Sequence, residues 1–222
     1  TDEIKMTVSE GIRSGYAWKY STDDRTADVN LRIFIEHENA FVGVRLGKHP
    51  QHERAYKVAE RSGSLKPSVA VAMLRLADVQ PGQRLLDPCC GSGTILIEAA
   101  LAGAAARGGD LDDEAVSAAR ANADAAGMTV MIEQWDARAL PLADHSVERV
   151  VSNLPWGRQI VLDENLYRDV CAEIERVLVP GGTAVLLSST PETLHFTALE
   201  PKDAIEISLY GQTPTISVFE GK

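Results

Sequence analysis

The sequence predicts an α/β fold with a doubly wound, mainly parallel sheet, and three observations support this prediction. Residues 83–87 form a strand pattern that breaks into a glycine turn and then opens a helix, which is how such a sheet forms a cleft at the end of its first strand. From Pro67 onward, helix and strand patterns alternate regularly. The last two strand patterns are joined by so short a turn that they must run antiparallel.

Residues 1–46 contain one clear pattern, a β-hairpin. Apolar side chains alternate with other residues over 29–36, a short turn follows, and residues 40–46 have the pattern of the return strand. One hairpin is marginally stable alone, and residues 1–26 ahead of it are interpreted as a leader of uncertain order. Because the chain begins at Thr1 rather than at methionine, we expect it to be a fragment of a longer protein.

The remaining residues, 47–222, alternate between helices and strands. Pro67 lies in the first turn of its helix, where proline is well tolerated. Asp112 is expected to cap another helix, followed by two acidic residues that the helix dipole favours. The sequence Val-Pro-Gly-Gly at 179–182 is expected to end a helix. The predicted helices span residues 67–77, 95–101, 113–126 and 164–178, and the predicted strands span 83–87, 106–110, 130–136, 147–152, 183–188, 204–209 and 215–219.

The turn after the first of these strands contains Gly91 and Gly93. Glycine has no Cβ, so the chain can reverse there and a ligand can approach the backbone closely. The third glycine of the dinucleotide pattern Gly-x-Gly-x-x-Gly is absent, and no Lys-Ser or Lys-Thr follows to build a phosphate-binding loop. The turn therefore favours a ligand without phosphates, or it merely joins strand to helix.

Three aspartates end three successive strand patterns. Asp87 closes the first, Asp110 closes the second, and Asp136 closes the third. A carboxylate about twenty residues beyond the glycine turn, the place of Asp110, can accept both hydroxyls of a ribose. A carboxylate in the place of Asp136 can accept from an adenine amino group, although Asp136 could equally be an ordinary turn aspartate.

Asn153-Leu154-Pro155-Trp156 follows a later strand. An amine conjugated to a base ring is a poor nucleophile because its lone pair is delocalised. The Asn153 side-chain oxygen and a backbone carbonyl around Leu154 or Pro155 can accept its two N–H groups and stabilise the developing charge. Pro155 fixes the backbone, and Trp156 offers a stacking face to a flipped base. The competing interpretations are a turn asparagine and a core tryptophan, but a tryptophan between Pro155 and Gly157 is poorly placed for a core.

Five motifs together resemble a known family. They are Asp87-Pro88-Cys89-Cys90-Gly91-Ser92-Gly93-Thr94, Asp110-Leu111-Asp112, Asp136-Ala137, Asn153-Leu154-Pro155-Trp156-Gly157 and Gly63-Ser64-Leu65-Lys66-Pro67. They resemble those of the class I S-adenosylmethionine-dependent methyltransferases that modify amino groups, and most of all the THUMP-containing methyltransferases that act on guanosine in tRNA. The resemblance covers roughly residues 27–222. Leu154 stands where the commoner acceptor motif has the first of two prolines.

The resemblance implies a Rossmann-like fold whose sheet has seven strands, mainly parallel with one antiparallel, preceded by a small β-hairpin and linker. It implies that residues 1–46 are the end of a THUMP-like domain with its linker, and that residues 47–222 are the methyltransferase domain. The residues implied to be catalytic are Asn153, Pro155 and Trp156. The residues implied to bind S-adenosyl-L-methionine are Asp87, Cys89, Gly91, Ser92, Gly93, Thr94, Asp110, Leu111, Asp136, Ala137, Asn153 and Lys66, the last within a segment that closes over the methionine end of the donor.

Composition argues against several other classes of protein. The chain has 222 residues, 45% of them hydrophobic, enough for one full core. It shows no signal peptide and no apolar run long enough to cross a bilayer. Cys89, Cys90 and Cys171 make an odd number without a Cys-x-x-Cys pair, and the histidines are scattered. We therefore expect no disulfide framework, no metal site and no cysteine nucleophile, and we expect a cytoplasmic monomer.

The net charge of −10 is unevenly distributed. Residues 1–66 hold 11 Lys and Arg against 10 Asp and Glu, whereas residues 67–222 hold 11 against 22. Within residues 45–66 the excess of basic side chains could form an edge that follows RNA phosphates, or simply a solvated linker. The basic residues of that segment are Arg45, Lys48, Arg54, Lys57, Arg61 and Lys66, with His49, His52 and Tyr56 among them.

The function favoured by the sequence is methylation of a guanosine exocyclic amino group in tRNA. Methylation of an adenine amino group in RNA or DNA is the second candidate, and methylation of a glutamine side chain is the third, because the same amide–proline–aromatic arrangement serves any planar amine. The alternative from another class is a catalytically silent RNA-binding subunit. Asn153 and Asp110 argue against it, since such a subunit has no chemical need for either residue.

Overall fold

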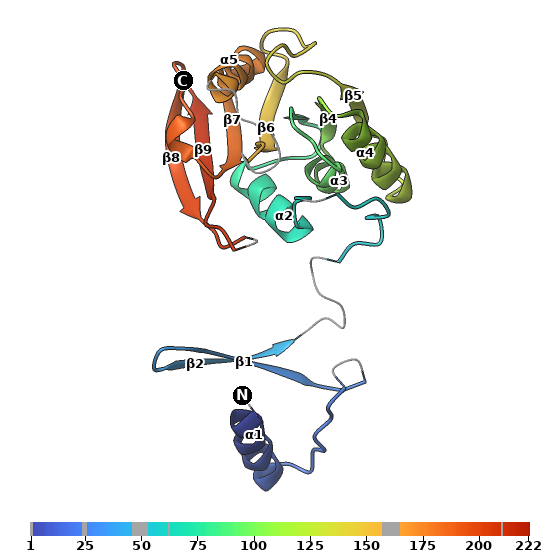
Figure 1. The fold of residues 1–222 in the computed structure, drawn as a ribbon, viewed down its shortest axis with the longest axis vertical. Helices are drawn as coiled ribbons and strands as arrows, with labels where there is room; N and C mark the ends of the chain where they lie inside the picture. Colours follow the sequence, from blue (N-terminus) through green and yellow to red (C-terminus); the bar gives the residue numbers. More distant parts are fainter. Residues whose placement is uncertain (1, 24–25, 46–52, 62, 157–164, 210) are drawn as a thin grey trace. The chain divides into compact units, whose positions relative to one another are not determined.

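The computed structural model describes residues 2–23, 26–45, 53–61, 63–156, 165–209 and 211–222. The chain forms two compact units, Thr1–Pro50 and Gln51–Lys222 (Figure 1). Each unit is described by itself.

The first unit contains a helix and a β-hairpin. The strands β1 (Asn30–Glu36) and β2 (Asn39–Arg45) pair antiparallel, as predicted. The helix α1 (Asp2–Gly15) was not predicted, because residues 1–26 were interpreted as a leader of uncertain order. The signal that could have revealed it is the spacing of Ile4, Val8 and Ile12, four residues apart on one helical face.

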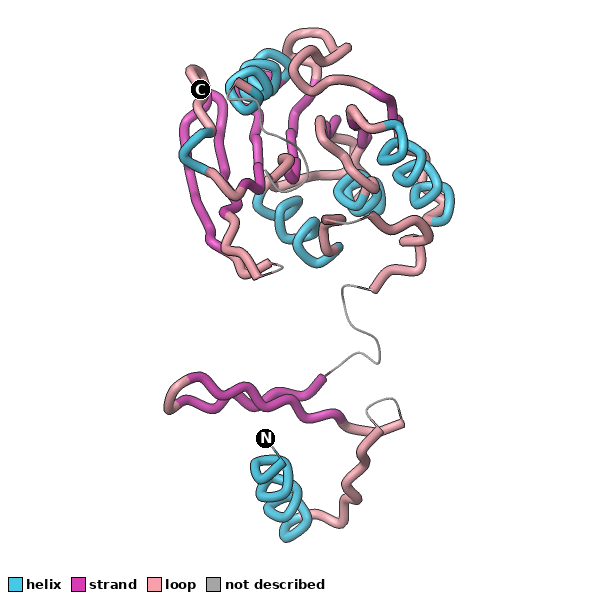
Figure 2. Tube along the Cα trace, viewed as in Figure 1, coloured by secondary structure: helices cyan, strands magenta, loops and turns pink. Residues whose placement is uncertain are grey.

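The second unit is built on one sheet of seven strands in the order β5-β4-β3-β6-β7-β9-β8 (Figure 2). The first five strands of that order run parallel, whereas β9 is antiparallel to both β7 and β8. The predicted sheet, with one antiparallel strand next to the edge, is therefore confirmed. The strands are β3 (Arg84–Asp87), β4 (Ala105–Asp110), β5 (Met131–Gln134), β6 (Val147–Asn153), β7 (Leu178–Ser188), β8 (Leu199–Glu206) and β9 (Thr215–Gly221).

Helices cover both faces of this sheet, and each face has its own core cluster. Residues of α2 (Pro67–Leu76), α3 (Thr94–Leu101) and α4 (Asp113–Ala125) share one cluster, and α5 (Leu166–Val177) contributes to the other. This two-sided packing is the doubly wound arrangement that the alternating pattern predicted. The single turn η1 (Pro191–Thr193) precedes β8.

Several strand boundaries differ from the prediction. The strand β5 ends at Gln134, so Asp136 lies two residues beyond the strand that it was predicted to close. The strand β7 begins at Leu178, so the Val-Pro-Gly-Gly sequence lies within the strand rather than ahead of it. Gly181 has a φ of 70°, and the pairing of β7 with β6 shifts register in the same region. The glycines therefore form a local irregularity within the strand instead of a turn ahead of it. The strand β8 spans Leu199–Glu206 instead of 204–209, because a charged edge strand lacks the apolar alternation that was sought.

No described helix is long and apolar enough to span a membrane. Within the described residues, no group of three or more His, Cys, Asp or Glu side chains is arranged to hold a metal ion.

Candidate active site

Four adjacent parallel strands carry a predicted site residue at or just beyond their carboxyl ends. Asp110, Asp87 and Asn153 are the last residues of β4, β3 and β6, and Asp136 follows β5 by two positions. Because parallel strands end at the same edge of a sheet, these side chains gather along one edge. The order of the strands reverses between β3 and β6, which is where sheets of this kind bind ligands.

The glycine turn between β3 and α3 has the backbone that the sequence predicted. Gly91 and Gly93 have φ angles of 52° and 81°, in the left-handed region. A Cβ on Gly93 would lie 3.0 Å from the Cβ of Ala119, so this glycine permits α3 and α4 to pack closely. A Cβ on Gly91 would meet no atom within 4 Å. Gly91 therefore borders open space, where a ligand can reach the backbone.

Two further glycines, which the sequence did not single out, let neighbouring strands and side chains pack closely against β4. A Cβ on Gly108 would lie 2.6 Å from the carbonyl oxygen of Asp87, and one on Gly109 would lie 2.3 Å from that of Glu133. Gly109 also faces the indole of Trp135, whose Nε1–H donates to the carbonyl oxygen of Pro88 over 3.0 Å. No side chain fits at either glycine.

Asp87 is buried at the junction of β3 and β6. One of its oxygens, Oδ1, accepts from the hydroxyl of Ser152 at 2.6 Å and from the backbone N–H of Cys89 at 3.3 Å. Burial raises the pKa of Asp87 to about 7, although both hydrogen bonds favour the ionised form. Its charge is therefore sensitive to a ligand at neutral pH.

The two cysteines of the turn are not reactive thiols. Cys90 is buried and Cys89 is half-buried. Burial, reinforced by the nearby carboxylates of Asp87 and Asp110, raises the pKa of both thiols well above the ordinary value. A thiol held neutral is a poor nucleophile, so both cysteines act as small side chains of the turn.

Asp110 ties the glycine turn to the start of α4. Its Oδ2 accepts from the N–H of Gly91 at 2.9 Å, and its Oδ1 accepts from the N–H of Asp112 at 3.1 Å. The predicted cap is confirmed, because Asp112 caps α4 by accepting from the N–H of Glu114. Each carboxylate oxygen of Asp110 has a further lone pair, so ribose binding stays a prediction. Leu111, between them, is exposed.

Asp136 is already paired within the chain. Its carboxylate contacts the guanidinium of Arg138 at 2.7 Å, and the hydrogen bonds from Arg138 lower its pKa. These contacts are compatible with a turn aspartate, and binding of an adenine amino group by Asp136 stays a prediction. Ala137, beside it, is buried.

The remaining residues predicted to bind the donor lie around the glycine turn. Ser92 is buried, and its hydroxyl lies 2.7 Å from that of Ser64. The hydroxyl of Thr94 is buried and has no hydrogen-bond partner among the described residues. Lys66 is exposed at the start of α2.

The acceptor side of the site begins with Asn153. Its Oδ1 and the Nε1 of Trp156 are both buried without a hydrogen-bond partner in the described part of the chain. Trp156 is half-buried and packs against a core cluster, so the expectation that it is poorly placed for a core was wrong. Gly157, the end of this motif, lies outside the described residues.

Tyr167 is a residue of this site that the sequence did not identify. It lies in α5, is buried, and donates its hydroxyl to the carbonyl oxygen of Pro155 at 2.6 Å. The bond holds the backbone that follows Asn153. A tyrosine in an amphipathic helix gives no signal of such a role.

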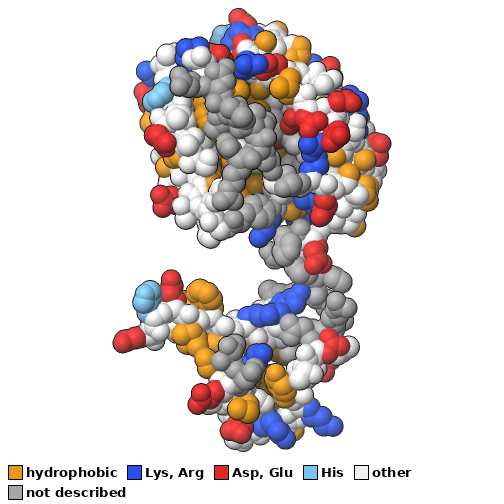
Figure 3. Space-filling view, in the orientation of Figure 1, with side chains coloured by type: hydrophobic (Ala, Val, Ile, Leu, Met, Phe, Trp, Pro, Cys, Tyr) orange, Lys and Arg blue, Asp and Glu red, His pale blue; other side chains and the backbone are white. Residues whose placement is uncertain are grey.

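The predicted basic edge is largely engaged inside the second unit. Arg54 forms an ion pair with Glu98 at 2.8 Å, and Arg61 forms one with Asp112. Lys57 donates to the hydroxyl of Ser64 at 2.9 Å. Basic and acidic side chains are accordingly mixed on the face of this unit seen in Figure 3. Lys48, His49 and His52 lie outside the described residues.

The chain matches a family described as "RMKL-like, methyltransferase domain" (UPF0020) over residues 54–206. It is 36% identical to a tRNA (guanine(6)-N2)-methyltransferase of Thermus thermophilus, over 98% of this chain and 67% of that protein. It is 32% identical to the human U6 snRNA (guanine-N(2))-methyltransferase THUMPD2, over 84% of this chain and 37% of that protein. The chain thus spans about two thirds of the first relative and under half of the second.

Solved structures agree with these relatives. The crystal structure of TrmN from Thermus thermophilus superimposes with a TM-score of 0.81 and 34% identity, over 100% of this chain and 68% of that one. SMU.472, a putative methyltransferase complexed with SAH, shares the fold with a TM-score of 0.70 and 18% identity, over 87% of this chain and 62% of that one. With the family match covering more than half of its residues, the chain belongs to the RMKL-like methyltransferase family, UPF0020.

Proposed function

We propose that this chain transfers a methyl group from S-adenosylmethionine to the exocyclic amino group of a guanosine in RNA, and that the RNA is a tRNA. The observation that carries the proposal is the buried Oδ1 of Asn153, at the strand end next to Asp87, which has no hydrogen-bond partner among the described residues. A buried acceptor without a partner is costly, and an amino group would satisfy it. The relatives from Thermus thermophilus and human are named as guanine-N2-methyltransferases.

The residues of the acceptor loop have distinct proposed roles. Asn153 accepts one N–H of the amine and thereby directs its lone pair away from the ring. Pro155 has its carbonyl engaged by Tyr167, so the carbonyl of Leu154 becomes the expected acceptor of the second N–H. Trp156 stacks against the base from the edge of the core.

The donor side fits a nucleoside that carries no phosphate. Gly91 borders open space, Asp110 offers a carboxylate to ribose hydroxyls, and Asp136 lies one strand further along the same edge. When bound, S-adenosylmethionine supplies a methyl group on a positively charged sulfur. Asp87, close to ionisation at neutral pH, is placed to balance positive charge at the centre of this edge.

The first unit is proposed to be the end of a THUMP-like domain, as its hairpin suggests, and to take part in RNA capture. The second unit carries most of the negative charge of the chain and will repel RNA over much of its surface. RNA binding should therefore be weak and should be lost above moderate salt, because few phosphate contacts support it.

The proposal is tested by incubating the chain with unmodified tRNA and labelled donor at low salt, then identifying the methylated nucleoside by mass spectrometry. N2-methylguanosine, absent with Asn153→Ala, supports it. N6-methyladenosine would favour the adenine alternative instead. Donor binding measured by calorimetry without any methylated nucleoside would favour the silent subunit.

A further inference from the structure

We propose that Asn122 is a positioning residue that couples the segment before α2 to the donor turn, so that donor binding and docking of that segment depend on each other. The connecting segment is defined as the described residues of 53–66, and the donor turn as residues 88–93. The inference rests on the proposed donor site.

Asn122 lies in α4 and is fully buried. Its Nδ2 donates to the carbonyl oxygens of Ala59 at 2.9 Å and Ser92 at 3.0 Å, and its Oδ1 accepts from the N–H of Ala59 at 2.8 Å. One amide thus holds the backbone of the connecting segment on one side and the backbone of the donor turn on the other. Both N–H donors and the acceptor oxygen of the Asn122 amide are thus used by these two backbone segments.

A second contact joins the same two pieces. The hydroxyls of Ser64 and Ser92 lie 2.7 Å apart, and Lys57 donates to Ser64 at 2.9 Å. Ser92 is therefore held at its carbonyl by Asn122 and at its hydroxyl by the connecting segment. The beginning of the segment is fixed to α3, because the buried carboxylate of Glu98 accepts from the hydroxyl of Tyr56 at 2.8 Å.

The donor turn depends on these outside contacts. Ser92 stands between Gly91 and Gly93, two glycines that have little conformational preference of their own. Asp110 holds the turn from the side of β4, and Asn122 and Ser64 hold it from the side of the connecting segment. Undocking the segment would remove the contact from Ser64 and would leave the amide of Asn122 without its two bonds to Ala59, so that only its bond to Ser92 remains. By reciprocity, a donor that binds the docked form must stabilise the docked segment by the same factor.

Hydrogen exchange of the unmodified chain tests this coupling without a mutation. With saturating S-adenosylmethionine, amides of residues 56–65, among them the N–H of Ala59, should exchange at least about fivefold more slowly. Amides of β8, at the far edge of the sheet, serve as the control and should not change. A chain that binds the donor while exchange of residues 56–65 stays the same overturns the inference alone. A chain that binds no donor overturns the proposed function and this inference with it.

Kinetics of variants then separates positioning from mere stability. Ser64→Ala should raise the donor KM about three- to tenfold with kcat nearly unchanged, because the hydroxyl that contacts Ser92 and Lys57 is lost. Ser64→Thr, which keeps the hydroxyl, should restore the KM, and Ser68→Ala, an exposed serine of α2, should have no effect. Asn122→Ala should raise the donor KM at least about tenfold and abolish the protection of residues 56–65 by donor. If the Asn122→Ala variant does not fold, the comparison of Ser64→Ala with Ser64→Thr tests the coupling instead. An unchanged donor KM in Ser64→Ala contradicts the coupling.

Discussion

The hydroxyl of Ser152 donates to Oδ1 of Asp87 over 2.6 Å and joins the ends of β6 and β3. Ser152 is fully buried and directly precedes Asn153, whereas Asp87 directly precedes the donor turn. One hydrogen bond therefore connects the proposed acceptor side of the site to its donor side. It also keeps Asp87 in place while burial raises its pKa to about 7.

Donor affinity should rise with pH between about 5.5 and 7.5. In the free protein Asp87 is largely protonated below its pKa of about 7, and a positively charged donor favours the ionised carboxylate. Binding therefore lowers that pKa and releases a proton, so affinity falls as the solution becomes more acidic. Calorimetry in buffers of different ionisation enthalpy measures both effects. Asp87→Asn should remove them, whereas Asp113→Asn, an exposed residue of α4, should keep them. Equal pH dependence in both variants would exclude Asp87 as the titrating group.

Asp110→Ala should weaken donor binding about ten- to a hundredfold, the loss of charge-assisted hydrogen bonds worth roughly 1.5–3 kcal/mol. The structure adds a second reason, because the substitution also releases the N–H of Gly91 from the donor turn. Isothermal titration with S-adenosylmethionine measures the affinity, and circular dichroism establishes that the variant is folded. Unchanged affinity in a folded variant would remove Asp110 from the site.

Asn153→Ala should reduce kcat by a factor on the order of 10²–10³ while donor affinity stays nearly unchanged, because the lost oxygen acts on the amine in the transition state. Single-turnover methylation of tRNA with the donor prebound gives the chemical rate. Trp156→Ala, by contrast, should raise mainly the KM for RNA, since its proposed role is stacking. Normal turnover in Asn153→Ala would refute activation of the amine by this side chain.

Tyr167→Phe should lower kcat about three- to tenfold, because it removes one hydrogen bond, that to the carbonyl of Pro155, and keeps the buried ring. The donor KM should not move, since the hydroxyl that is removed donates to the acceptor loop and the ring stays in place. Additivity is tested by combining Tyr167→Phe with Asn153→Ala in one chain. If both residues act on the same amine, the double variant should lose less kcat than the product of the two single effects. An independent, fully multiplicative effect would speak against a shared role.

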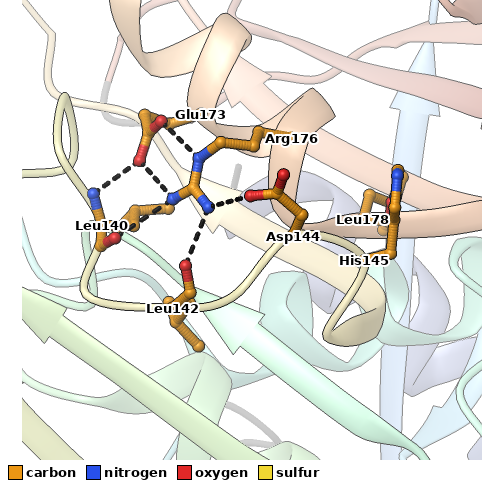
Figure 4. Close-up of polar contacts among 7 residues, drawn as sticks. All are labelled: Leu140, Leu142, Asp144, His145, Glu173, Arg176 and Leu178. Carbon is orange, nitrogen blue, oxygen red and sulfur yellow. Dashed lines mark hydrogen bonds and ion pairs between the residues drawn. The ribbon is translucent and has the colours of Figure 1, made fainter.

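Arg176 clamps the loop before β6 onto α5 (Figure 4). It forms a two-pronged ion pair with Glu173, with both distances 2.7 Å, contacts Asp144 at 2.7 Å, and donates to the carbonyl oxygens of Leu140 and Leu142. Arg176→Met should lower the free energy of unfolding of the second unit by about 1.5–3 kcal/mol, the range for hydrogen bonds to a charged group. Urea unfolding followed by circular dichroism measures it.

The same ion pair predicts an acid-dependent part of the stability. Hydrogen bonds from Arg176 lower the pKa of Glu173 below its ordinary value of 4.5. The stabilisation is thus present above that ordinary value and is lost as pH falls through the lowered pKa of the folded state. Arg176→Met should flatten this acid dependence. Arg168→Met, an exposed arginine on the same helix that pairs with its neighbour Asp169, should change stability by less than about 0.5 kcal/mol at any pH.

The sheet and its glycine turn could be predicted because they depend on local signals. Gly91 and Gly93 adopt the left-handed backbone that only glycine adopts easily, and the carboxyl ends of β3, β4 and β6 carry the polar residues expected there. The short connection between the last two strand patterns also gave the antiparallel pair at the edge. Periodicity does not predict the bounds of a charged strand such as β8. It also does not predict those of β7, where Gly181 lies within a paired strand although its sequence is typical of a turn.

The parts of the site that could not be predicted depend on contacts between distant residues. Asn122 and Tyr167 are ordinary helix residues in the sequence, and only the fold brings them to Ala59 and to Pro155. The basic residues before α2 show the same limitation, because Arg54 finds its partner 44 positions away in Glu98. Composition counts such charges but cannot say which are neutralised within the chain.

The three tryptophans lie in different surroundings, so the intrinsic fluorescence of the chain can report on ligand binding. Trp135 is buried and its N–H is bonded to Pro88 of the donor turn, so its emission reports on the donor side of the site. Trp18 is half-exposed and belongs to the first unit. Trp156 alone combines a place in the proposed acceptor loop with an unpartnered indole N–H among the described residues. In a chain that carries Trp18→Phe and Trp135→Phe, a fluorescence change on adding a guanine-containing oligonucleotide can thus be assigned to Trp156, and occupation of the acceptor site can be followed in real time without an attached dye.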